Sequence, residues 1–270
     1  CTFFALFSVY LLWKRKIFTS AVFLSLGIAT KMYPIFFLIP VLIYIYRDQG
    51  LEKSLKYFLL FSICGTLVFG SFLLFPGGLE FVYRLFVFKA SPDLYGGNLI
   101  SGLTWMHLFS MLRLEGNFPI FPLIFIPLYL GLNYFFWKNS ENDFDSLVTC
   151  VVCILFITYL SYTVVNPQYV FWVLPFLLYL VVKGKFSKRL YVIFSVIPLV
   201  FMYACFNPLQ FVSPAIIWEE WNFPPWSDII EQLRQRIFTG EAIFLIELLF
   251  CFVSLFSLLL LLKRHKKGKL

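Results

Sequence analysis

The chain has 270 residues, of which 61% are hydrophobic, 21% are aromatic and only 13% are charged. A water-soluble domain usually carries about 25% charged residues, so this composition excludes a soluble globular protein. The 22 Lys and Arg residues outnumber the 14 acids, giving a net charge of +8. In a soluble protein such an excess would suggest nucleic acid or an acidic partner. Here the positions of the charges indicate membrane topology, and no nucleic-acid partner is expected.

Apolar runs separated by short charged clusters indicate helices that cross a membrane, because about 20 apolar residues span a hydrocarbon core about 30 Å thick. The sequence therefore predicts an all-α, multi-pass transmembrane helical bundle, a single domain over 1–270. In chain order, the runs are a partial one at 2–13, a long stretch at 17–46, and spans at 57–75, 119–137, 147–165, 168–182, 190–206 and 242–262.

The stretch 17–46 can be read as one helix or as two limbs. One helix of 30 residues would be about 45 Å long at 1.5 Å per residue. Lys31 and Pro34 interrupt its middle and favour two limbs, 17–30 and 34–46. Limbs about 20 Å long are expected to form a re-entrant pair or to pack inside protein, where irregular backbone is tolerated.

The distribution of basic residues also favours two limbs. With two limbs, 16 of the 22 Lys and Arg residues share one face. With one helix, the Lys14 cluster stands opposite the other clusters and the bias disappears or reverses. The positive-inside rule then places the 16 in the cytoplasm. They form five clusters: Lys14-Arg15-Lys16, Arg47/Lys53/Lys56, Lys138, Lys183/Lys185/Lys188/Arg189 and Lys263/Arg264/Lys266/Lys267/Lys269.

Two long polar segments, 76–118 and 207–241, lie outside the cytoplasm on this topology. They hold eight of the 14 acids, so aqueous chemistry is expected on that face. Their aromatic residues, Trp221 among them, fit either an interfacial belt or a platform for carbohydrate or lipid. His107 is a lone histidine in the first segment and a weak candidate for catalysis.

A few polar residues within the apolar sequence are candidates for function. Lys31 lies in GIATKMYP, and a Lys at the bilayer centre costs roughly 2.5–3.5 kcal/mol. It is expected either to snorkel to the interface or to bind a phosphate in an outer cavity. Asn166, Gln168 and Tyr169 lie in NPQYVFWVLP, a Pro-broken tip in which Asn-Pro is also ordinary turn chemistry. Glu247, the one acid inside a span, is expected to face a polar cavity or to pair with Lys31 or an Arg.

Motifs for other chemistry are missing from the sequence. It contains no Walker loop, no G-x-G-x-x-G fingerprint and no H-E-x-x-H, so soluble nucleotide chemistry and zinc proteolysis have no support. Cys150 and Cys153 have C-x-x-C spacing, but they lie among Val and Leu with no second pair or His nearby. We expect these thiols to act as small hydrophobes, and predict no metal and no cofactor.

Two of these stretches together resemble the membrane-embedded C-fold (GT-C) glycosyltransferases, which use polyprenyl-phosphate sugars. LSLGIATKMYPIFFLIPVLIY is similar to their K-x-Y-P element, and NPQYVFWVLPFLL to their later P-Q-Y-x-x-W-x-x-P element. The resemblance is closer to the family 87 (DUF2029-type) mannosyltransferases and more distant to the PIG-M-type GPI mannosyltransferases.

The resemblance implies inverting transfer of a sugar, mannose by analogy, from a polyprenyl-phosphate donor to a lipid or glycan acceptor on the extracytoplasmic face. Lys31 and Tyr33 would hold the phosphate, while Gln168, Tyr169 and Trp172 would shape the donor or lipid pocket. The implied substrate-binding residues are Lys31, Tyr33, Asn166, Gln168, Tyr169 and Trp172, with His107, Glu247 and Trp221 as weaker candidates.

The resemblance also bears on the general base. Such enzymes carry a catalytic Asp in the first outer loop, upstream of K-x-Y-P, and the 30 residues before Lys31 contain no acid. The chain is therefore expected to be the C-terminal portion of a longer protein whose base lies upstream. The donor that the resemblance implies is a lipid-linked sugar, which would require no nucleotide site.

Other functions stay open at this stage. A lipid-linked glycan flippase or transporter would need polar residues along several spans, and apart from Glu247 the spans offer few. An envelope glycan polymerase or ligase would need outer-loop Arg and His clusters, and a non-catalytic subunit of a glycan assembly complex would need no base. The expected partners are membrane lipid, a polyprenyl-phosphate sugar and a glycan or glycolipid acceptor. A prokaryotic plasma membrane is preferred over the endoplasmic reticulum because the closer resemblance is to a prokaryotic family.

Overall fold

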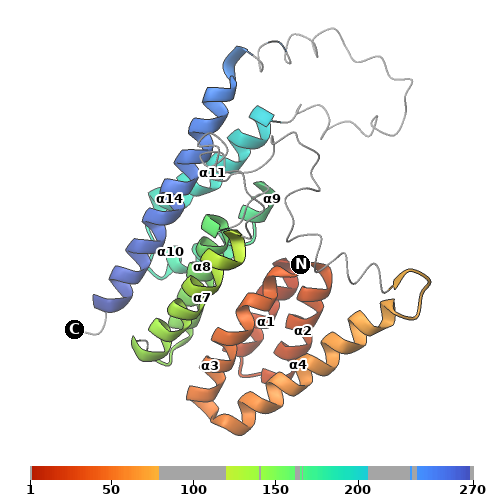
Figure 1. The fold of residues 1–270 in the computed structure, drawn as a ribbon. Coiled ribbons are helices and arrows are strands. Elements are labelled where there is room, and N and C mark those ends of the chain that lie inside the picture. Colours follow the sequence, from red (N-terminus) through yellow and green to blue (C-terminus); the bar gives the residue numbers. More distant parts are fainter. Residues whose placement is uncertain are drawn as a thin grey trace.

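A computed structural model describes residues 2–78, 120–139, 141–161, 165, 167–205, 232 and 236–267 (Figure 1). All regular secondary structure in these ranges is helical, which confirms the predicted all-α class. The elements are α1 (Thr2–Trp13), α2 (Ile17–Thr30), the 3₁₀ helix η1 (Tyr33–Phe37), α3 (Leu38–Gln49), α4 (Leu51–Phe72), α7 (Ile120–Asn139), α8 (Phe144–Ser161), α9 (Pro167–Val170), α10 (Leu174–Val182), α11 (Lys188–Cys205) and α14 (Gly240–Lys267).

The stretch 17–46 forms two limbs, as predicted. Helix α2 ends at Thr30, and Lys31 follows in an extended conformation with φ −160° and ψ 142°. Pro34 then lies in the first turn of η1, where its missing N–H and fixed φ are tolerated. The chain turns back through α3, so α1, α2, α3 and α4 alternate in direction side by side (Figure 1).

Contacts between the turns confirm that basic clusters from distant parts of the chain share one end of the bundle. Arg15 Nη2, between α1 and α2, lies 3.7 Å from Asp48 Oδ1 at the end of α3. Lys185 Nζ lies 2.8 Å from Asp145 Oδ2. Arg264 Nη1, near the end of α14, donates a hydrogen bond of 3.0 Å to the Lys185 carbonyl. That this end faces the cytoplasm stays a prediction.

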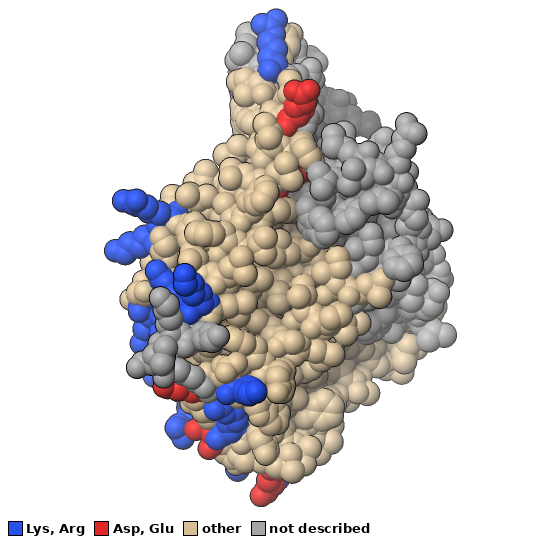
Figure 2. Space-filling model, turned by 60° about the vertical axis from the view of Figure 1, so that its left-hand side comes forward, with Lys and Arg blue, Asp and Glu red and all other residues tan. Residues whose placement is uncertain are grey.

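Three described helices are long and apolar enough to cross a membrane: Leu51–Ser71, Phe144–Ser161 and Glu241–His265. Figure 2 shows a broad surface without charged side chains, with most Lys and Arg gathered to one side of it. A wide uncharged surface bordered by basic side chains is the form expected of a bundle in a bilayer. These features support a membrane location.

Helix α8 is the centre of the second half of the bundle. Of its 18 residues, 83% are buried, and it packs against α7, α10 and α14. In the first half, α1, α2 and α4 are joined by buried hydroxyl groups: Ser8 Oγ donates to the Ser20 carbonyl at 2.9 Å, and Ser20 Oγ lies 3.4 Å from Tyr57 Oη.

The prediction that 168–182 forms a single membrane-spanning helix is wrong. The chain forms α9, a turn at 171–173 and then α10. Pro175 lies at the start of α10, where its ring and missing N–H oppose a continuous helix through the preceding turn. The predicted outer segments 76–118 and 207–241 lie almost wholly outside the described residues.

The shared basic end gives a topology prediction. Cysteines placed at Lys14 and Lys263, both exposed at that end, should react with a membrane-impermeant maleimide only after permeabilisation. A cysteine at Leu74, which is 84% exposed just beyond the opposite end of α4, should react from outside. The unsubstituted protein measures the background from its six native cysteines. Labelling of Lys263→Cys from outside would contradict the orientation.

Candidate functional site: a cation and aromatic cluster at two helix breaks

The two sequence motifs meet in the structure. The Trp172 ring stacks on Tyr33, with centroids 3.8 Å apart and planes 8° apart, and on Tyr169, with centroids 4.3 Å apart and planes 24° apart. Lys31 Nζ lies 4.5 Å from the Tyr169 ring centroid and 5.3 Å from that of Trp172. We call these four residues the cation–aromatic cluster. Each lies at or beside a break in a helix.

The break after α2 positions Lys31 and Tyr33. Thr30 Oγ1 donates to the Gly27 carbonyl at 2.8 Å and completes the last turn of α2. The extended backbone at Lys31 then directs the chain out of the helical path, and η1 begins at Tyr33. The Tyr33 ring also contacts Phe37 edge to face, with centroids 5.8 Å apart. This half of the cluster is therefore held by local structure.

The break between α9 and α10 positions Tyr169 and Trp172, and a buried tyrosine of α8 holds it. Tyr159 Oη donates a hydrogen bond of 2.8 Å to the Tyr169 carbonyl, which also accepts a bond of 3.0 Å from the Trp172 N–H. Tyr159 is 1% exposed. Buried tyrosine hydroxyls usually find a partner, and here the partner is a carbonyl of the short helix α9.

Sequence reasoning did not identify Tyr159. The one sequence feature that could have indicated its role is a tyrosine at the end of the apolar run VVCILFITY. Such a residue in a buried helix needs a hydrogen-bond acceptor, but the acceptor is set by tertiary packing.

The cluster offers donors suited to an anion. Lys31 is half-buried, and its contact with aromatic faces contributes about 0.5–2 kcal/mol. Tyr33 is 4% exposed, and its hydroxyl makes no hydrogen bond of ordinary geometry to the described residues, although the Thr2 side chain lies near enough to interact with it. A buried hydroxyl without a partner costs about 1–3 kcal/mol, so a ligand oxygen that accepted a hydrogen bond from it would be favoured. An ammonium and a phenol at one place match the oxygens of a phosphate.

Of the other predicted site residues, Glu247 alone has a side chain that the structure describes. Asn166, His107 and Trp221 lie outside the described residues, as does the Gln168 side chain, although the Gln168 backbone belongs to α9. Glu247 lies in α14 and is 1% exposed. Its role, and the predicted pairing with Lys31, stay predictions.

The face of α14 that carries Glu247 packs close to the support of the cluster. One turn further along this helix, the Phe250 ring lies 6.0 Å from the ring of Tyr159. Tyr159 in turn holds the Tyr169 carbonyl. Glu247 therefore belongs to the same part of the bundle as Tyr159.

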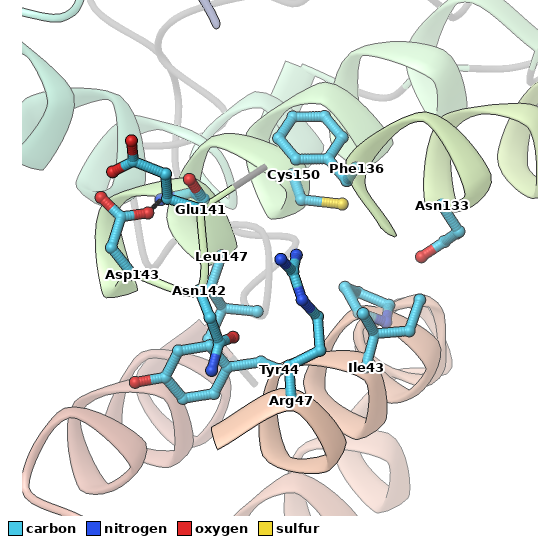
Figure 3. Close-up of a pocket in the computed structure, with 12 residues that line it drawn as sticks. Ile43, Tyr44, Arg47, Asn133, Phe136, Glu141, Asn142, Asp143, Leu147 and Cys150 are labelled. Atoms are coloured by element: carbon cyan, nitrogen blue, oxygen red, sulfur yellow. Dashed lines mark hydrogen bonds between the residues drawn. The ribbon is translucent and has the colours of Figure 1, made fainter. Parts of the chain in front are cut away.

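The charged end of the bundle holds a different kind of cavity. In Figure 3 the Arg47 guanidinium points from α3 into the space beside α7 and α8, with Glu141 and Asp143 at one side. This cavity has a volume of about 30 Å³, which suits a water molecule and not a sugar. A neighbouring cavity of about 340 Å³ is lined by Lys185 and Arg264, which already take part in contacts between turns. We therefore assign a structural role, and not a catalytic one, to the charged residues at this end of the bundle.

A family model described as mannosyltransferase (PIG-M) matches residues 1–219. The chain belongs to this mannosyltransferase family. The match includes both motifs of the cation–aromatic cluster, while α14 and Glu247 lie beyond it. Comparisons with curated proteins and with solved structures find no match. The predicted resemblance to the PIG-M type is confirmed, and that to the family 87 type stays a prediction.

The hydrogen bond from Tyr159 gives a stability prediction for this mannosyltransferase. Tyr159→Phe keeps the ring contacts and removes one buried hydrogen bond, which contributes about 0.5–1.5 kcal/mol net. Thermal unfolding in detergent should show a Tm lower by about 2–4 °C. Tyr134→Phe is the matched control, because Tyr134 is 66% exposed, and its Tm should not change. Equal Tm values for the two variants would argue against the role of this hydrogen bond.

Proposed function

We propose that this chain carries the donor site of a mannosyltransferase that moves mannose from a polyprenyl-phosphate carrier to a lipid or glycan acceptor on the extracytoplasmic face. The carrying observation is the cation–aromatic cluster, in which Lys31 and the buried Tyr33 hydroxyl lie beside two stacked aromatic rings. Membership of the mannosyltransferase family supports the reaction class.

The proposed chemistry is a direct displacement. The acceptor hydroxyl oxygen attacks the anomeric carbon from the face opposite the phosphate, the bond from that carbon to the phosphate oxygen breaks, and the configuration inverts. A carboxylate base takes the acceptor proton. The cation–aromatic cluster contains no carboxylate, so it does not supply this base. Polyprenyl phosphate leaves with the bonding electrons.

Lys31 and Tyr33 have the proposed role of stabilising the leaving group. Negative charge grows on the phosphate as the bond breaks, so fixed donors in a place of low dielectric lower the barrier. The Tyr169 and Trp172 rings hold the ammonium beside the phosphate and offer flat surfaces to the sugar. Asn166 and Gln168 precede Tyr169 in the chain and are proposed to contact the donor from the same segment.

The position of the cluster supports an extracytoplasmic site. Lys31 follows the end of α2 that lies opposite the basic turn 14–16. If the positive-inside rule applies to the shared basic end, the cluster belongs to the outer half of the bundle. The choice between a prokaryotic plasma membrane and the endoplasmic reticulum does not affect this geometry.

The role of Lys31 can be tested by transfer assays on the native full-length protein in membranes. Lys31→Ala should reduce transfer from polyprenyl-phosphate mannose by about 100-fold or more, because a donor to a developing charge contributes about that factor. Lys31→Arg, which keeps the cation, should retain part of the activity. Lys138→Ala removes an exposed cation at the other end of the bundle and should leave the rate unchanged.

Two results would count against the proposal. Undiminished transfer by Lys31→Ala would remove the phosphate-binding role. A native protein that moves lipid-linked glycan across liposomes without transferring mannose would instead support the flippase alternative, and one that does neither would support a non-catalytic subunit.

A further inference from the structure

The cavity of about 340 Å³ at the basic end of the bundle is large enough for a small ligand, since ligand pockets usually have volumes of about 300–1,000 Å³. It lies where α7 ends, α8 begins and α14 approaches its last turn. None of the four residues of the cation–aromatic cluster lines it. Its ionisable lining residues are Glu141, Asp143, Lys185, Arg264 and His265.

Two of these side chains keep unused binding capacity. Arg264 donates one hydrogen bond from Nη1, to the Lys185 carbonyl, and a guanidinium has five N–H donors. Neither Arg264 nor Glu141 forms an ion pair within the described part of the chain. Lys185 differs, because its Nζ already lies 2.8 Å from Asp145 Oδ2 and 3.9 Å from Asp143 Oδ2. The cavity therefore offers one cation and one carboxylate to a ligand.

A ligand with a single charge matches this lining poorly. An anion at Arg264 would also meet the carboxylates of Glu141 and Asp143, and a cation at Glu141 would also meet Arg264. A ligand that carries both a phosphate and an ammonium satisfies both sides. A guanidinium binds phosphate oxygens through paired N–H groups, and a primary ammonium has three N–H donors for a carboxylate.

The surroundings of Arg264 indicate that this ligand is a membrane lipid. The candidate span Glu241–His265 ends beside Arg264, so the guanidinium lies where the apolar part of the helix meets water. Steps of three or four residues from Arg264 back along α14 reach Leu260, Phe256 and Leu249 on the same face. Phe256 is 54% and Leu249 50% exposed, so acyl chains can lie along this face.

We infer that this cavity binds the head group of phosphatidylethanolamine, with the phosphate at Arg264 and the ammonium at Glu141. Basic pockets between membrane helices are a common place for lipid head groups. The bound lipid would join α14 to the segment that precedes α8, in addition to the protein contacts already present there. This inference goes beyond the proposed function and does not rest on it.

Lipid-dependent thermal unfolding of the native full-length protein in detergent tests the inference. Saturating short-chain phosphatidylethanolamine should raise the Tm by about 2 °C or more, because a ligand that binds the folded state stabilises it. Phosphatidylcholine with the same chains should raise it clearly less, because its quaternary ammonium has no N–H donor. Phosphatidylglycerol should also raise it less, because it has no cation for Glu141.

Two variants separate the two halves of the head-group site. Glu141→Gln should lose the preference for phosphatidylethanolamine over phosphatidylglycerol, and Arg264→Gln should lose the Tm shift with both lipids. Both side chains are exposed, so the folded protein should form in each case. Glu52→Gln and Lys263→Gln are the matched controls, since each removes an exposed charge outside the cavity and should keep the full shift.

Native mass spectrometry gives a second readout that does not depend on stability. In an equal mixture of the three lipids, the native protein should retain one phosphatidylethanolamine molecule preferentially. Glu141→Lys, which leaves only cations for the ligand on that side of Asp143, should instead retain phosphatidylglycerol. A structural role of Glu141 alone would not reverse the lipid preference.

Three results would overturn the inference. Equal Tm shifts with phosphatidylethanolamine and phosphatidylcholine would show that the ammonium is not recognised. A larger shift with phosphatidylglycerol in the native protein would mean that the site prefers an anion. The same shift with free phosphoethanolamine at equal concentration would mean that the occupant is a soluble zwitterion and not a lipid.

Discussion

The structure depends on one constraint: inside a membrane, every backbone polar group needs a partner within the protein. Helices satisfy this need by themselves, but the two breaks described here do not. The break after α2 and the break between α9 and α10 lie against each other, joined by the stacked rings of Tyr33 and Trp172. The carbonyl of Tyr169, at the second break, accepts hydrogen bonds from the Trp172 N–H and from the hydroxyl of Tyr159 of α8. The two stretches of irregular backbone therefore pack against each other, and side chains of the neighbouring helices stabilise them.

This arrangement explains why polar chemistry can exist in so apolar a chain. A lysine among apolar residues is expensive, and the aromatic faces of Tyr169 and Trp172 offset part of that cost. The Trp172 ring contacts both the Lys31 ammonium and the Tyr33 ring. Separate sets of turns at the other end carry ion pairs, such as that of Lys185 with Asp145, which join helices. The cavities there are one of about 30 Å³ beside Arg47 and one of about 340 Å³ lined by Lys185 and Arg264.

Sequence reasoning predicted the parts of the site whose residues interrupt an otherwise apolar run. Lys31 and Pro34 stand out in a hydrophobic stretch, so the first break and the return of the chain could be predicted. The break at 171–173 was missed because residues 170–174 are all apolar, and Pro175 alone does not say whether a helix bends or stops. The hydrogen bond of Tyr159 depends on which helices become neighbours, and no single segment encodes that.

Helices α4 and α8 both satisfy the composition of a membrane span, yet they meet different surroundings. In an 18-residue stretch of Leu51–Ser71 only 17% is buried in the bundle, against 83% of Phe144–Ser161. A residue facing fluid lipid has to be apolar, whereas a residue enclosed by other helices must also match the volume of its neighbours. Over evolutionary time the outer face of α4 is therefore free to exchange one apolar side chain for another. Helix α8 is not, because each such exchange would leave a void or a clash at the support of Tyr169.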